Sequence, residues 1–515
     1  MKFTLNEIIE ATGAEVSFSH SEAESYEILR FAQNDQIAEE SNNLMKFEIS
    51  TDTRTIKKGD IYLPLKGANF DGEDFCDKAL DAGAIGCFHT KESEKLNNFQ
   101  QNKIFLKVPD TLSAYLQIAN FARKKINPIV IGVTGSSGKT TTKEMIYSVV
   151  SQKFKTQKTF SNHNNEIGFC QTVLGMEDDC EVLIVEMGMR GLGEIELITK
   201  YAEPDYAVIT NAGSAHIGRL GSLDNIAKAK CEITHGLKKA LIAHDNERIK
   251  KFADFEGEKV FYSLKDVEIL EKAKGYSKFI YKGNEYELNI EGDYNIENAL
   301  SAIEIGLHLG MTYEEIKSGL AKYKPIEKRW ECENIGGYNI INDSYNANPE
   351  SMKASVSTFL ELYPNSVVIL GNMGELGENE VEFHREVGRF LSGKLKVVSD
   401  AAKQLGSYAA KSDNSEIFQK QQSDNDLFAY SPIRLFTDTN FITVGNLALH
   451  IGEELEKKGF SVRHFDNNIE TSRYILENVD VGTTIFLKAS RSMKFEEIIE
   501  NLKNGSKTGA SANEN

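Results

Sequence analysis

Short apolar runs recur through the middle of the chain and alternate with stretches of helical spacing. The runs IVIGVT (129–134), EVLIVEMG (181–188) and YAVITNAG (206–213) are rich in β-branched residues and have the length of buried strands. After the first of them, KTTTKEMIYSVV (139–150) carries apolar residues at helical intervals. Strands that alternate with helices in this way form parallel sheets. The pattern predicts a three-layer α/β domain over residues 109–325.

The pattern begins again near residue 326. Four further strands are predicted, YNIINDSY, SVVILGNMG, NFITVG and TTIFLKAS, with helices between them. They indicate a second α/β domain of Rossmann-like type over 326–515, whose tail from 503, KNGSKTGASANEN, we expect to be disordered. Residues 1–108 hold short strands such as FEIST and GDIYLPL and the helix-like EDFCDKALDAGA, which predicts a further α/β domain. Polar stretches at 20–44 and 411–430 are interpreted as surface insertions.

Composition narrows the class of protein. A chain of 515 residues is long enough for several domains with substantial cores. The net charge of −18 and the lack of a long basic stripe argue against a nucleic-acid partner. Six cysteines occur without any C-x-x-C pair, which is typical of buried thiols in a reducing compartment. No signal peptide or apolar run of about 18 residues is found, so we expect a cytoplasmic protein without a membrane span.

The stretch GVTGSSGKTTTKEM (132–145) has the chemistry of a phosphate-binding loop. A strand, a glycine turn and a helix start present backbone N–H groups to an anion. Gly135 and Gly138 let the backbone approach a phosphate, Lys139 supplies positive charge, and Thr140 offers a hydroxyl to Mg²⁺. The alternative is a plain strand-to-helix turn with an incidental lysine and threonine. The agreement of loop, lysine, hydroxyl and flanking elements favours nucleotide binding.

Three residues are candidate partners of this loop. Glu186 ends an apolar run, where a carboxylate could bind Mg²⁺, although a solvated strand-end glutamate would look the same. His216 alone would more often be structural, but its place after the next strand makes a second metal site plausible. Lys230 follows fourteen positions later on a helical run. Taken alone, Lys228 and Lys230 are solvated helix lysines.

Several motifs occur in the order in which they are found in the Mur ligases, and they resemble the motifs of that family. These motifs are GVTGSSGKTTTKEM, NHNNEIG, VEMGMRGLGEI, TNAGSAHIGRLGS and IAKAKCEI. Mur ligases build the peptide stem of bacterial cell-wall precursors. An ordinary P-loop has glycine where this chain has Val133, and the departure resembles the Mur ligases' own form of the loop.

The resemblance extends over nearly the whole chain, apart from the two insertions and the tail. NDSYNANPESMKASVSTF, LGNMGELGENEVEFHREVG and LKASRSMKFEEII resemble the C-terminal motifs of the ligase that acts last in the series. STDTRTIKKGDIYLPLKGANFDGEDF resembles the uridine-nucleotide-binding domain that this ligase shares with the preceding one. This implies an ATP-dependent, ADP-forming amide ligase that joins D-alanyl-D-alanine to UDP-N-acetylmuramoyl-tripeptide through an acyl phosphate. Its pathway is peptidoglycan synthesis, and we expect a monomer that uses ATP and two Mg²⁺ ions.

The resemblance also implies roles for individual residues. Those expected to contact ATP are Gly135, Ser136, Ser137, Gly138, Lys139, Thr140, Thr141, Asn295, Asn298, Arg329, Asp343, Tyr345 and Asn348. Those expected to bind Mg²⁺ are Thr140, Glu186, His216 and a carbamylated Lys230. Those expected to hold the UDP-sugar are Ser50, Asp52, Arg54, Lys66 and Gly67. Catalysis is assigned to Lys139, His216, Lys230, Arg329 and Asp343.

Five positions depart from the family pattern, and three alternative functions remain open. The departures are Tyr294 for a histidine, Glu73 in place of the histidine of DGH, Asn372 for an aspartate, and Ala489 and Ser492 for glycines. A sibling ligase that adds the third stem residue would carry different C-terminal motifs. A folate-polyglutamate-type ligase would not carry this N-terminal region. A catalytically inactive binding homologue is disfavoured because the loop lysine and the candidate metal ligands are intact.

Overall fold

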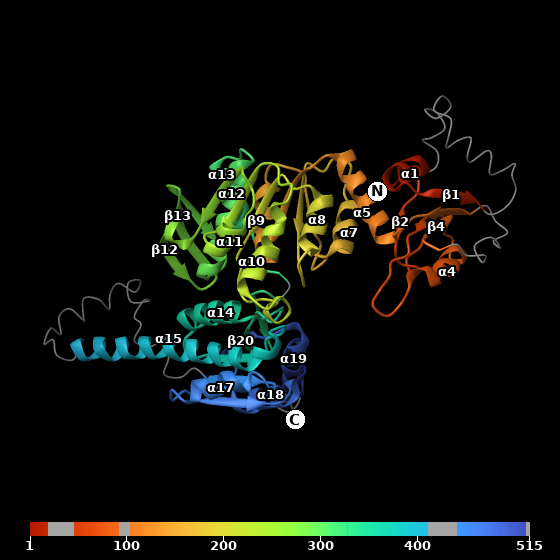
Figure 1. The fold of residues 1–515 in the computed structure, drawn as a ribbon. Helices are drawn as coiled ribbons and strands as arrows, with labels where there is room; N and C mark the ends of the chain where they lie inside the picture. The colour runs from red at the N-terminus through yellow and green to blue at the C-terminus, as the bar shows by residue number, and fades with distance from the viewer. Residues whose placement is uncertain (19–45, 92–102, 327, 410–439, 511–515) are drawn as a thin grey trace. The chain divides into compact units, whose positions relative to one another are not determined.

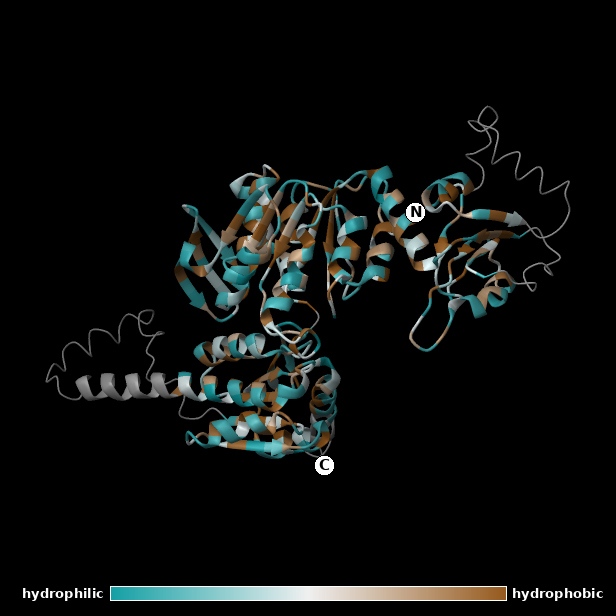
Figure 2. Ribbon diagram, viewed as in Figure 1, coloured by the Kyte–Doolittle hydropathy of each residue, from teal (hydrophilic) through white to brown (hydrophobic). Residues whose placement is uncertain are grey.

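The computed structural model of the chain describes residues 1–18, 46–91, 103–326, 328–409 and 440–510 (Figure 1). The predicted insertions at 20–44 and 411–430 lie outside these ranges. The described elements form four sheets, with strand orders β1-β5-β4-β3-β2, β11-β10-β9-β6-β8-β7, β12-β13-β14 and β15-β16-β20-β17-β18-β19. Figure 2 shows apolar residues concentrated on the strands, in brown. The α/β class predicted from the alternation of strands and helices is confirmed.

The chain packs into two compact units. The first comprises residues 1–132, 154–188 and 194–205, and the second comprises 133–153, 189–193 and 206–515. Strand β6 (Ile129–Thr134) begins in the first unit and ends in the second. The three domains predicted from the sequence divide the chain differently and stay a prediction.

The first unit contains a five-stranded mixed sheet. Its strands are β1 (Glu15–Phe18), β2 (Ile49–Ser50), β3 (Ile61–Tyr62), β4 (Gly86–His89) and β5 (Ile104–Lys107). Strand β1 is antiparallel to β5, and the other pairs are parallel. Helix α1 (Leu5–Thr12) begins in a capping box at Thr4, and α4 (Cys76–Asp81) buries Cys76, Ala79 and Leu80 against the sheet.

The remainder of the first unit is α/β. It holds α5 (Thr111–Ile126), β7 (Thr156–Lys158), α7 (Glu166–Leu174), β8 (Val182–Glu186) and α8 (Glu194–Ala202). Every residue of β8 is buried, as expected for a parallel strand covered on both faces. Its last residue is Glu186, so the buried strand delivers that carboxylate to its carboxyl end.

The second unit begins with the phosphate-loop helix α6 (Lys139–Val150) and the parallel strands β9 (Tyr206–Ile209), β10 (Ala240–His244) and β11 (Glu258–Tyr262). Its helices in this region are α9 (Ile217–Leu220), α10 (Leu223–Cys231), α11 (Glu247–Phe252), α12 (Asp293–His308) and α13 (Tyr313–Lys322). A small antiparallel sheet, which we did not predict, consists of β12 (Val267–Ala273), β13 (Tyr276–Tyr281) and β14 (Asn284–Leu288).

The C-terminal part of the second unit is a six-stranded sheet with helices. Its strands are β15 (Glu331–Ile335), β16 (Tyr338–Asn342), β17 (Val367–Gly371), β18 (Asn440–Val444), β19 (Val462–Phe465) and β20 (Thr484–Lys488). Only the β15–β16 pair is antiparallel among the described pairs of this sheet. The helices are α14 (Pro349–Leu362), α15 (Glu380–Ala409), α17 (Leu449–Glu456), α18 (Asn468–Asn478) and α19 (Glu496–Ala510). All four predicted strands are present.

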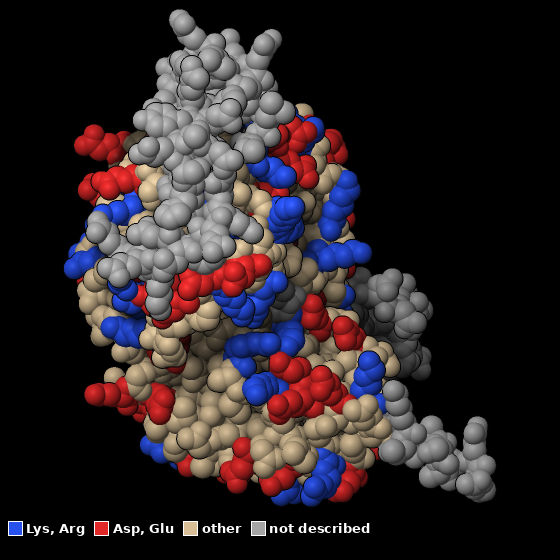
Figure 3. All heavy atoms as spheres, turned by 90° about the vertical axis from the view of Figure 1, so that its right-hand side faces the viewer, with Lys and Arg blue, Asp and Glu red and all other residues tan. Residues whose placement is uncertain are grey.

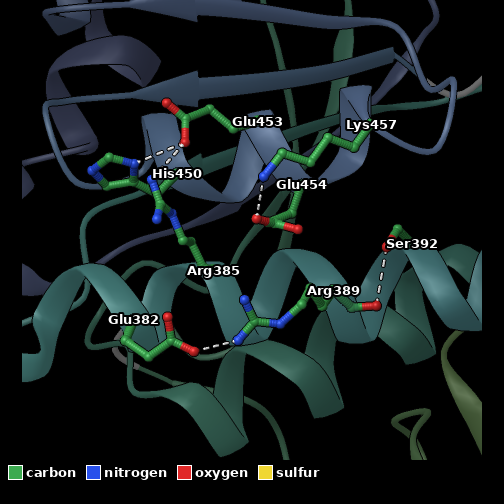
Figure 4. Close-up of polar contacts among 8 residues, drawn as sticks. All are labelled: Glu382, Arg385, Arg389, Ser392, His450, Glu453, Glu454 and Lys457. Atoms are coloured by element: carbon green, nitrogen blue, oxygen red, sulfur yellow. Dashed lines mark hydrogen bonds and ion pairs between the residues drawn. The ribbon is translucent and has the colours of Figure 1, made fainter.

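A network of charged side chains joins α15 to α17 (Figure 4). Arg385 donates to Glu453 at 3.2 Å, and His450 Nδ1 lies 3.1 Å from the same carboxylate oxygen. Arg389 pairs with Glu382 at 2.5 Å along α15. Exposed pairs of this kind contribute only about 0–1 kcal/mol each, so the network adds little to the stability of the fold.

Two expectations need correction. The tail predicted to be disordered from residue 503 is helical as far as Ala510, and 511–515 lie outside the described residues. Helix α19 is anchored by the buried Ile498 and Leu502, and a helix that has begun adds one hydrogen bond per residue.

Five cysteines are buried as expected, but Cys332 is exposed on the edge strand β15. Within the described ranges, no helix combines the length and the apolar character that a bilayer crossing requires.

Candidate active site

The phosphate loop packs so tightly that only glycine fits at two of its positions. Gly135 has φ of +151°, and a Cβ there would lie 1.9 Å from Thr210 Oγ1. Gly138 has φ of +79°, and a Cβ there would lie 2.5 Å from Asn298 Oδ1. The loop between β6 and α6 therefore lies directly against the end of β9 and against α12.

Asn211, at the carboxyl end of β9, organises the loop. Its Oδ1 accepts from the backbone N–H groups of Ser136 at 3.1 Å and Ser137 at 3.0 Å. Its Nδ2 donates to Ser137 O at 3.1 Å, and Thr210 Oγ1 donates to the same carbonyl at 2.5 Å. We did not predict Asn211. The available signal was a polar residue directly after an apolar strand, the position at which ligand-binding side chains gather in parallel sheets.

The start of α6 is suited to an anion. Its N-cap is Gly138, which provides no side-chain cap, so the positive end of the helix dipole faces the loop. Lys139 Nζ donates to Gly135 O at 2.8 Å and so curls back across the loop. Glycines without Cβ atoms, an uncapped twelve-residue helix and a lysine together fit a polyphosphate.

Arg329, from the C-terminal part of the second unit, reaches this loop. Its Nη2 donates to Thr140 Oγ1 at 3.0 Å, and its guanidinium stacks 3.9 Å from the Tyr345 ring centroid. The flanking residues Lys328 and Trp330 have φ of +57° and +63°, in the left-handed backbone region, which is costly for residues with a Cβ. The structure thus brings three predicted residues together, at a strained segment.

Asp343 is paired inside the unit. Lys488 Nζ donates to Asp343 Oδ2 at 2.7 Å, and their side chains are only 5% and 13% exposed, respectively. The two residues come from β20 and from the loop after β16, which are parallel neighbours. We did not predict Lys488, although a lysine at the end of the apolar run TIFL was a usable signal.

Three predicted asparagines take helical positions. Asn298 accepts from Thr142 Oγ1 at 3.2 Å and lies against Gly138 of the loop. Asn295 is 1% exposed and donates to Glu291 O at 2.7 Å. Asn348 is the N-cap of α14 and accepts from Ser351 N at 2.9 Å. Among the described residues, Asn298 approaches the loop directly, whereas Asn295 and Asn348 make these bonds at the starts of α12 and α14.

His216 faces a carboxylate from the C-terminal part. Its Nδ1 lies 2.5 Å from Glu375 Oε2, a close polar contact that is an ion pair only if the ring is protonated. A nearby contact joins the same segments, because Ser214 donates through N–H and Oγ to Glu350 at 3.1 Å and 2.7 Å. The interaction with His216, together with the charges of Arg219 and Arg190, keeps the pKa of the Glu375 carboxyl below its ordinary value, although partial burial opposes the shift.

Lys230 and Lys228 differ sharply in environment. Lys230 is 0% exposed on α10, whereas Lys228 is exposed with its ammonium 5.2 Å from the Phe252 ring centroid. The interpretation of Lys230 as a solvated helix lysine is therefore wrong. Burying an ammonium is costly, which indicates that Lys230 has a specific role.

Glu186 belongs to the first unit and is also buried, at 2% exposure. Asn164 Nδ2 donates to its Oε1 at 3.0 Å, and its own N–H donates to Thr159 Oγ1 at 3.0 Å. A solvated strand-end glutamate is thereby excluded. No cluster of three or more His, Cys, Asp or Glu side chains suited to a metal occurs in the described ranges.

Comparisons with known proteins decide the family. Residues 133–306 match the Mur ligase middle domain, and residues 328–424 match the Mur ligase, glutamate ligase domain. A UDP-N-acetylmuramoyl-tripeptide–D-alanyl-D-alanine ligase of Bacillus subtilis is 35% identical over 468 residues, which are 88% of this chain and 92% of that protein.

The chain belongs to the Mur ligase family.

Three further similarities agree with this assignment. A Synechocystis protein with the same name as the B. subtilis ligase is 38% identical over 350 residues, covering 66% of this chain and 75% of that one. A crystal structure of MurF from Acinetobacter baumannii has the same fold, with a TM-score of 0.77, 24% identity and coverage of 98% and 99%. The MurF ligase of Thermotoga maritima in complex with ADP gives a TM-score of 0.72 at 24% identity, with coverage of 90% and 98%.

The departures from the Mur ligase pattern have local explanations. Asn372 Oδ1 accepts from the N–H groups of Leu447 at 3.0 Å and Ala448 at 2.8 Å, a role that aspartate could also perform. Glu73 accepts from the N–H and hydroxyl of Thr90 at 3.0 Å and 2.5 Å. Tyr294 packs edge-on to Trp330, and burial raises the pKa of its phenol well above the ordinary value.

The last two departures replace glycines near β20. Ala489 is buried and its methyl group packs against Gly371. Ser492 Oγ lies 3.0 Å from Ser490 Oγ. Both side chains therefore have room beside β20.

The residues predicted to hold a UDP-sugar lie in the first unit. Arg54 donates to both carboxylate oxygens of Asp52, at 2.9 Å and 2.6 Å, and these bonds lower the pKa of Asp52 to about 2. Ser50 Oγ donates to Asp52 O at 3.3 Å. Gly67 lies under the Phe70 ring, where a Cβ would come within 2.3 Å of a ring carbon. Three of the five are thus brought together, while Lys66 and Gly67 lie on a separate loop. Figure 3 shows basic and acidic side chains mixed over the visible face.

Proposed function

We propose that this Mur ligase joins D-alanyl-D-alanine to UDP-N-acetylmuramoyl-tripeptide, with cleavage of ATP to ADP and phosphate. The product would be the pentapeptide precursor of peptidoglycan. The relatives that share 35% and 38% identity carry the name of this ligase. The observation that carries the proposal is the contact of Arg329 with Thr140 on the phosphate loop, because it joins the two parts that a Mur ligase needs for ATP.

The loop and the start of α6 would hold the phosphates of ATP. Lys139 would move from Gly135 O to a phosphate oxygen, since an ammonium is more stable beside an anion than beside a carbonyl. Arg329 and Tyr345 would close on the nucleotide from the C-terminal part, with Asp343 held in place by Lys488. Ser136, Ser137, Thr141, Asn295, Asn298 and Asn348 would complete the site.

Mg²⁺ would be bound by Thr140 and Glu186, and a second ion by His216 and a carbamylated Lys230. Hydroxyl and carboxylate oxygens are the ligands that Mg²⁺ prefers, and a carbamate turns a lysine into such a ligand. The burial of Lys230 and Glu186 supports this assignment, because both are polar and both lie away from solvent. Bound Mg²⁺ would offset the negative charge of the reacting phosphates.

The chemistry takes two steps. The terminal carboxylate of the tripeptide attacks the γ-phosphorus, the bond from that phosphorus to the β–γ bridging oxygen breaks, and ADP leaves. The amine of D-alanyl-D-alanine then attacks the acyl carbon of the acyl phosphate, loses a proton, and expels phosphate. Lys139 and Arg329 would stabilise the charge that develops on the transferred phosphoryl group. Asp52, Arg54, Ser50, Lys66 and Gly67 would hold the UDP-sugar.

The cytoplasm is the proposed compartment, and no nucleic acid is required. Six cysteines without disulfide bonds suit a reducing environment. The protein would act as a monomer. Region 1–108 would bind the UDP-sugar, region 109–325 would bind ATP, and region 326–515 would close over the nucleotide.

A product assay tests the reaction. We expect ADP release to require UDP-N-acetylmuramoyl-tripeptide and D-alanyl-D-alanine together, and the product mass to equal the UDP-pentapeptide. AMP and pyrophosphate among the products would contradict the acyl-phosphate route. Ligation of a single amino acid to the UDP-dipeptide, without use of the D-alanyl dipeptide, would assign the chain to the sibling activity. ATP binding without turnover of either substrate pair would indicate an inactive homologue.

A further inference from the structure

The contact between His216 and Glu375 joins the loop after β9 to the loop after β17. Oε2 of Glu375 lies 2.5 Å from His216 Nδ1, and the backbone carbonyl of Glu375 accepts from Gly218 N at 3.3 Å. Side chain and backbone of one residue therefore both reach the segment that carries His216. The side chain of His216 is 17% exposed and that of Glu375 is 42% exposed, so the contact lies at the edge of solvent.

Both residues are held in an unusual backbone conformation. His216 has φ of +65° and Glu375 has φ of +62°, in the left-handed region that residues with a Cβ seldom adopt. The backbones also approach closely, since a Cβ on Gly218 would lie 2.3 Å from Gly377 N. A conformation that costs about 1–3 kcal/mol per residue persists only where its surroundings determine it, and such residues cluster at functional sites.

A buried histidine, His384, holds the loop that carries Glu375 through hydrogen bonds to its backbone. His384 is 0% exposed, and its Nε2 accepts from Met373 N at 2.9 Å while its Nδ1 donates to Glu380 O at 2.6 Å. Both ring nitrogens are thus committed to the backbone on either side of Glu375. The Glu375 carboxylate is presented by a braced turn.

We propose that Glu375 is the positioning residue for His216: its carboxylate engages Nδ1 and so directs Nε2 toward the metal ion. The inference rests on the proposed function, in which His216 binds Mg²⁺. A histidine that ligates a metal through one ring nitrogen usually gives the other to a carboxylate or carbonyl, which sets both the tautomer and the ring orientation. Because Glu375 follows β17 and His216 follows β9, the C-terminal sheet supplies the group that prepares a ligand beside the phosphate loop. Docking of that sheet and metal binding are then coupled.

A plain salt bridge is the competing explanation. An exposed ion pair contributes about 0–1 kcal/mol and has no effect on a ligand bound elsewhere. The two explanations differ in what they predict for metal affinity, which can be measured without turnover.

Binding of Mn²⁺, titrated by electron paramagnetic resonance in the presence of a non-hydrolysable ATP analogue, tests the proposal. We expect Glu375→Ala to weaken the His216-dependent Mn²⁺ site by about 10- to 100-fold, the usual effect of removing such a carboxylate. Glu375→Gln keeps an oxygen that can accept from Nδ1, so it should recover part of the loss. Glu378→Ala is the matched control, because Glu378 is an exposed glutamate three positions further along the same turn. The control should bind Mn²⁺ like the wild type.

The variant His216→Ala distinguishes a wrong positioning role for Glu375 from a wrong metal assignment for His216. If His216→Ala weakens Mn²⁺ binding and Glu375→Ala does not, the positioning role is wrong while the metal assignment stands. If His216→Ala binds Mn²⁺ as tightly as the wild type, the metal assignment in the proposed function is wrong. Equal losses in Glu375→Ala and Glu378→Ala would indicate a general charge effect and would also overturn the positioning role. A thermal melt of each variant excludes unfolding as the cause.

Discussion

Lys228 and Lys230 stand two positions apart on α10, yet one is exposed and the other is completely buried. Without the resemblance to Mur ligases, the two had the same interpretation, since both are lysines on a polar helix. Glu186 and Lys488 are likewise charged residues with 2% and 4% exposure at the ends of apolar strands. Burial of a charged group is costly unless another group compensates it, and the bonds of Glu186 to Asn164 and of Lys488 to Asp343 provide such compensation.

Substitution of Lys230 tests the carbamate directly. Lys230→Met retains the length of the buried side chain but cannot form a carbamate, and we expect turnover to fall by about 100- to 1000-fold, as for other lost electrostatic contacts. Lys230→Ala should lose similar activity and also about 2–5 kcal/mol of stability, because it removes buried methylene groups. Acetate or formate at high concentration should restore activity to Lys230→Ala, which has space for it, and not to Lys230→Met. Wild-type turnover of Lys230→Met at saturating Mg²⁺ would return Lys230 to a structural role.

At the scale of elements, the phosphate loop is constrained by its neighbours. Asn211 supplies hydrogen bonds to Ser136 and Ser137, and Asn298 lies against Gly138. The loop is thus preformed by β9 and α12 rather than shaped by the nucleotide. Preformed backbone donors gain binding energy because little ordering is needed when the phosphate arrives.

Two glycine substitutions separate backbone strain from steric fit. Gly138 and Gly310 have φ of +79° and +64°, but only Gly138 has a neighbour within reach of a Cβ. Both Gly138→Ala and Gly310→Ala should lose about 1–2 kcal/mol from the left-handed backbone. Gly138→Ala should in addition displace Asn298 and weaken binding of a fluorescent ATP analogue, whereas Gly310→Ala should bind it normally. Equal nucleotide affinities in the two variants would show that the loop tolerates the extra carbon.

Regular elements could be predicted from the chain because their signal is local. β8, with every residue buried, and β17 stood out as apolar runs. The antiparallel sheet β12–β14 was missed because β12 exposes charged residues on one face and carries no continuous apolar run.

The residues that hold the site residues in place were missed for a different reason. Asn211 lies 74 positions from Ser137, and Lys488 lies 145 positions from Asp343, so only the fold brings them together. The resemblance to Mur ligases supplied most of the site residues, but it did not supply the groups that hold them.

At the scale of the whole molecule, the stability of an acidic chain depends on which cationic and hydrogen-bonding groups its carboxylates contact. The net charge is −18, so acidic groups outnumber basic ones, and ion pairs limit the repulsion among them. Glu203, after α8, belongs to one cluster of such pairs. Its side chain accepts from Asn120 at 3.0 Å and pairs with Arg123 at 2.8 Å and Lys124 at 3.0 Å, which ties the end of α8 to α5.

The pH dependence of stability should reflect this cluster. Burial would raise the pKa of Glu203, but hydrogen bonds from Asn120 and Lys124 and the charge of Arg123 lower it to about 2. A carboxyl whose folded pKa is depressed stabilises the fold above its unfolded pKa of about 4.5 and loses that contribution as pH falls toward the folded value. Glu203→Gln should therefore melt below the wild type near neutral pH, and the difference in melting temperature should shrink between about pH 4.5 and pH 2. A difference that is constant over this range would mean that Glu203 contributes by packing alone.

The strained segment beside Arg329 has an optical consequence. Trp330 is the only tryptophan in the chain, it is 2% exposed, and its indole N–H has no hydrogen-bond partner among the described residues. It packs on Phe486 of β20 and faces Tyr294 of α12, so it lies where the nucleotide-binding and C-terminal parts of the second unit meet. Indole emission shifts with the polarity around the ring. All tryptophan fluorescence of this protein therefore comes from the contact between these two parts. The natural chain thus carries its own spectroscopic label for any movement of Arg329 as nucleotide binds.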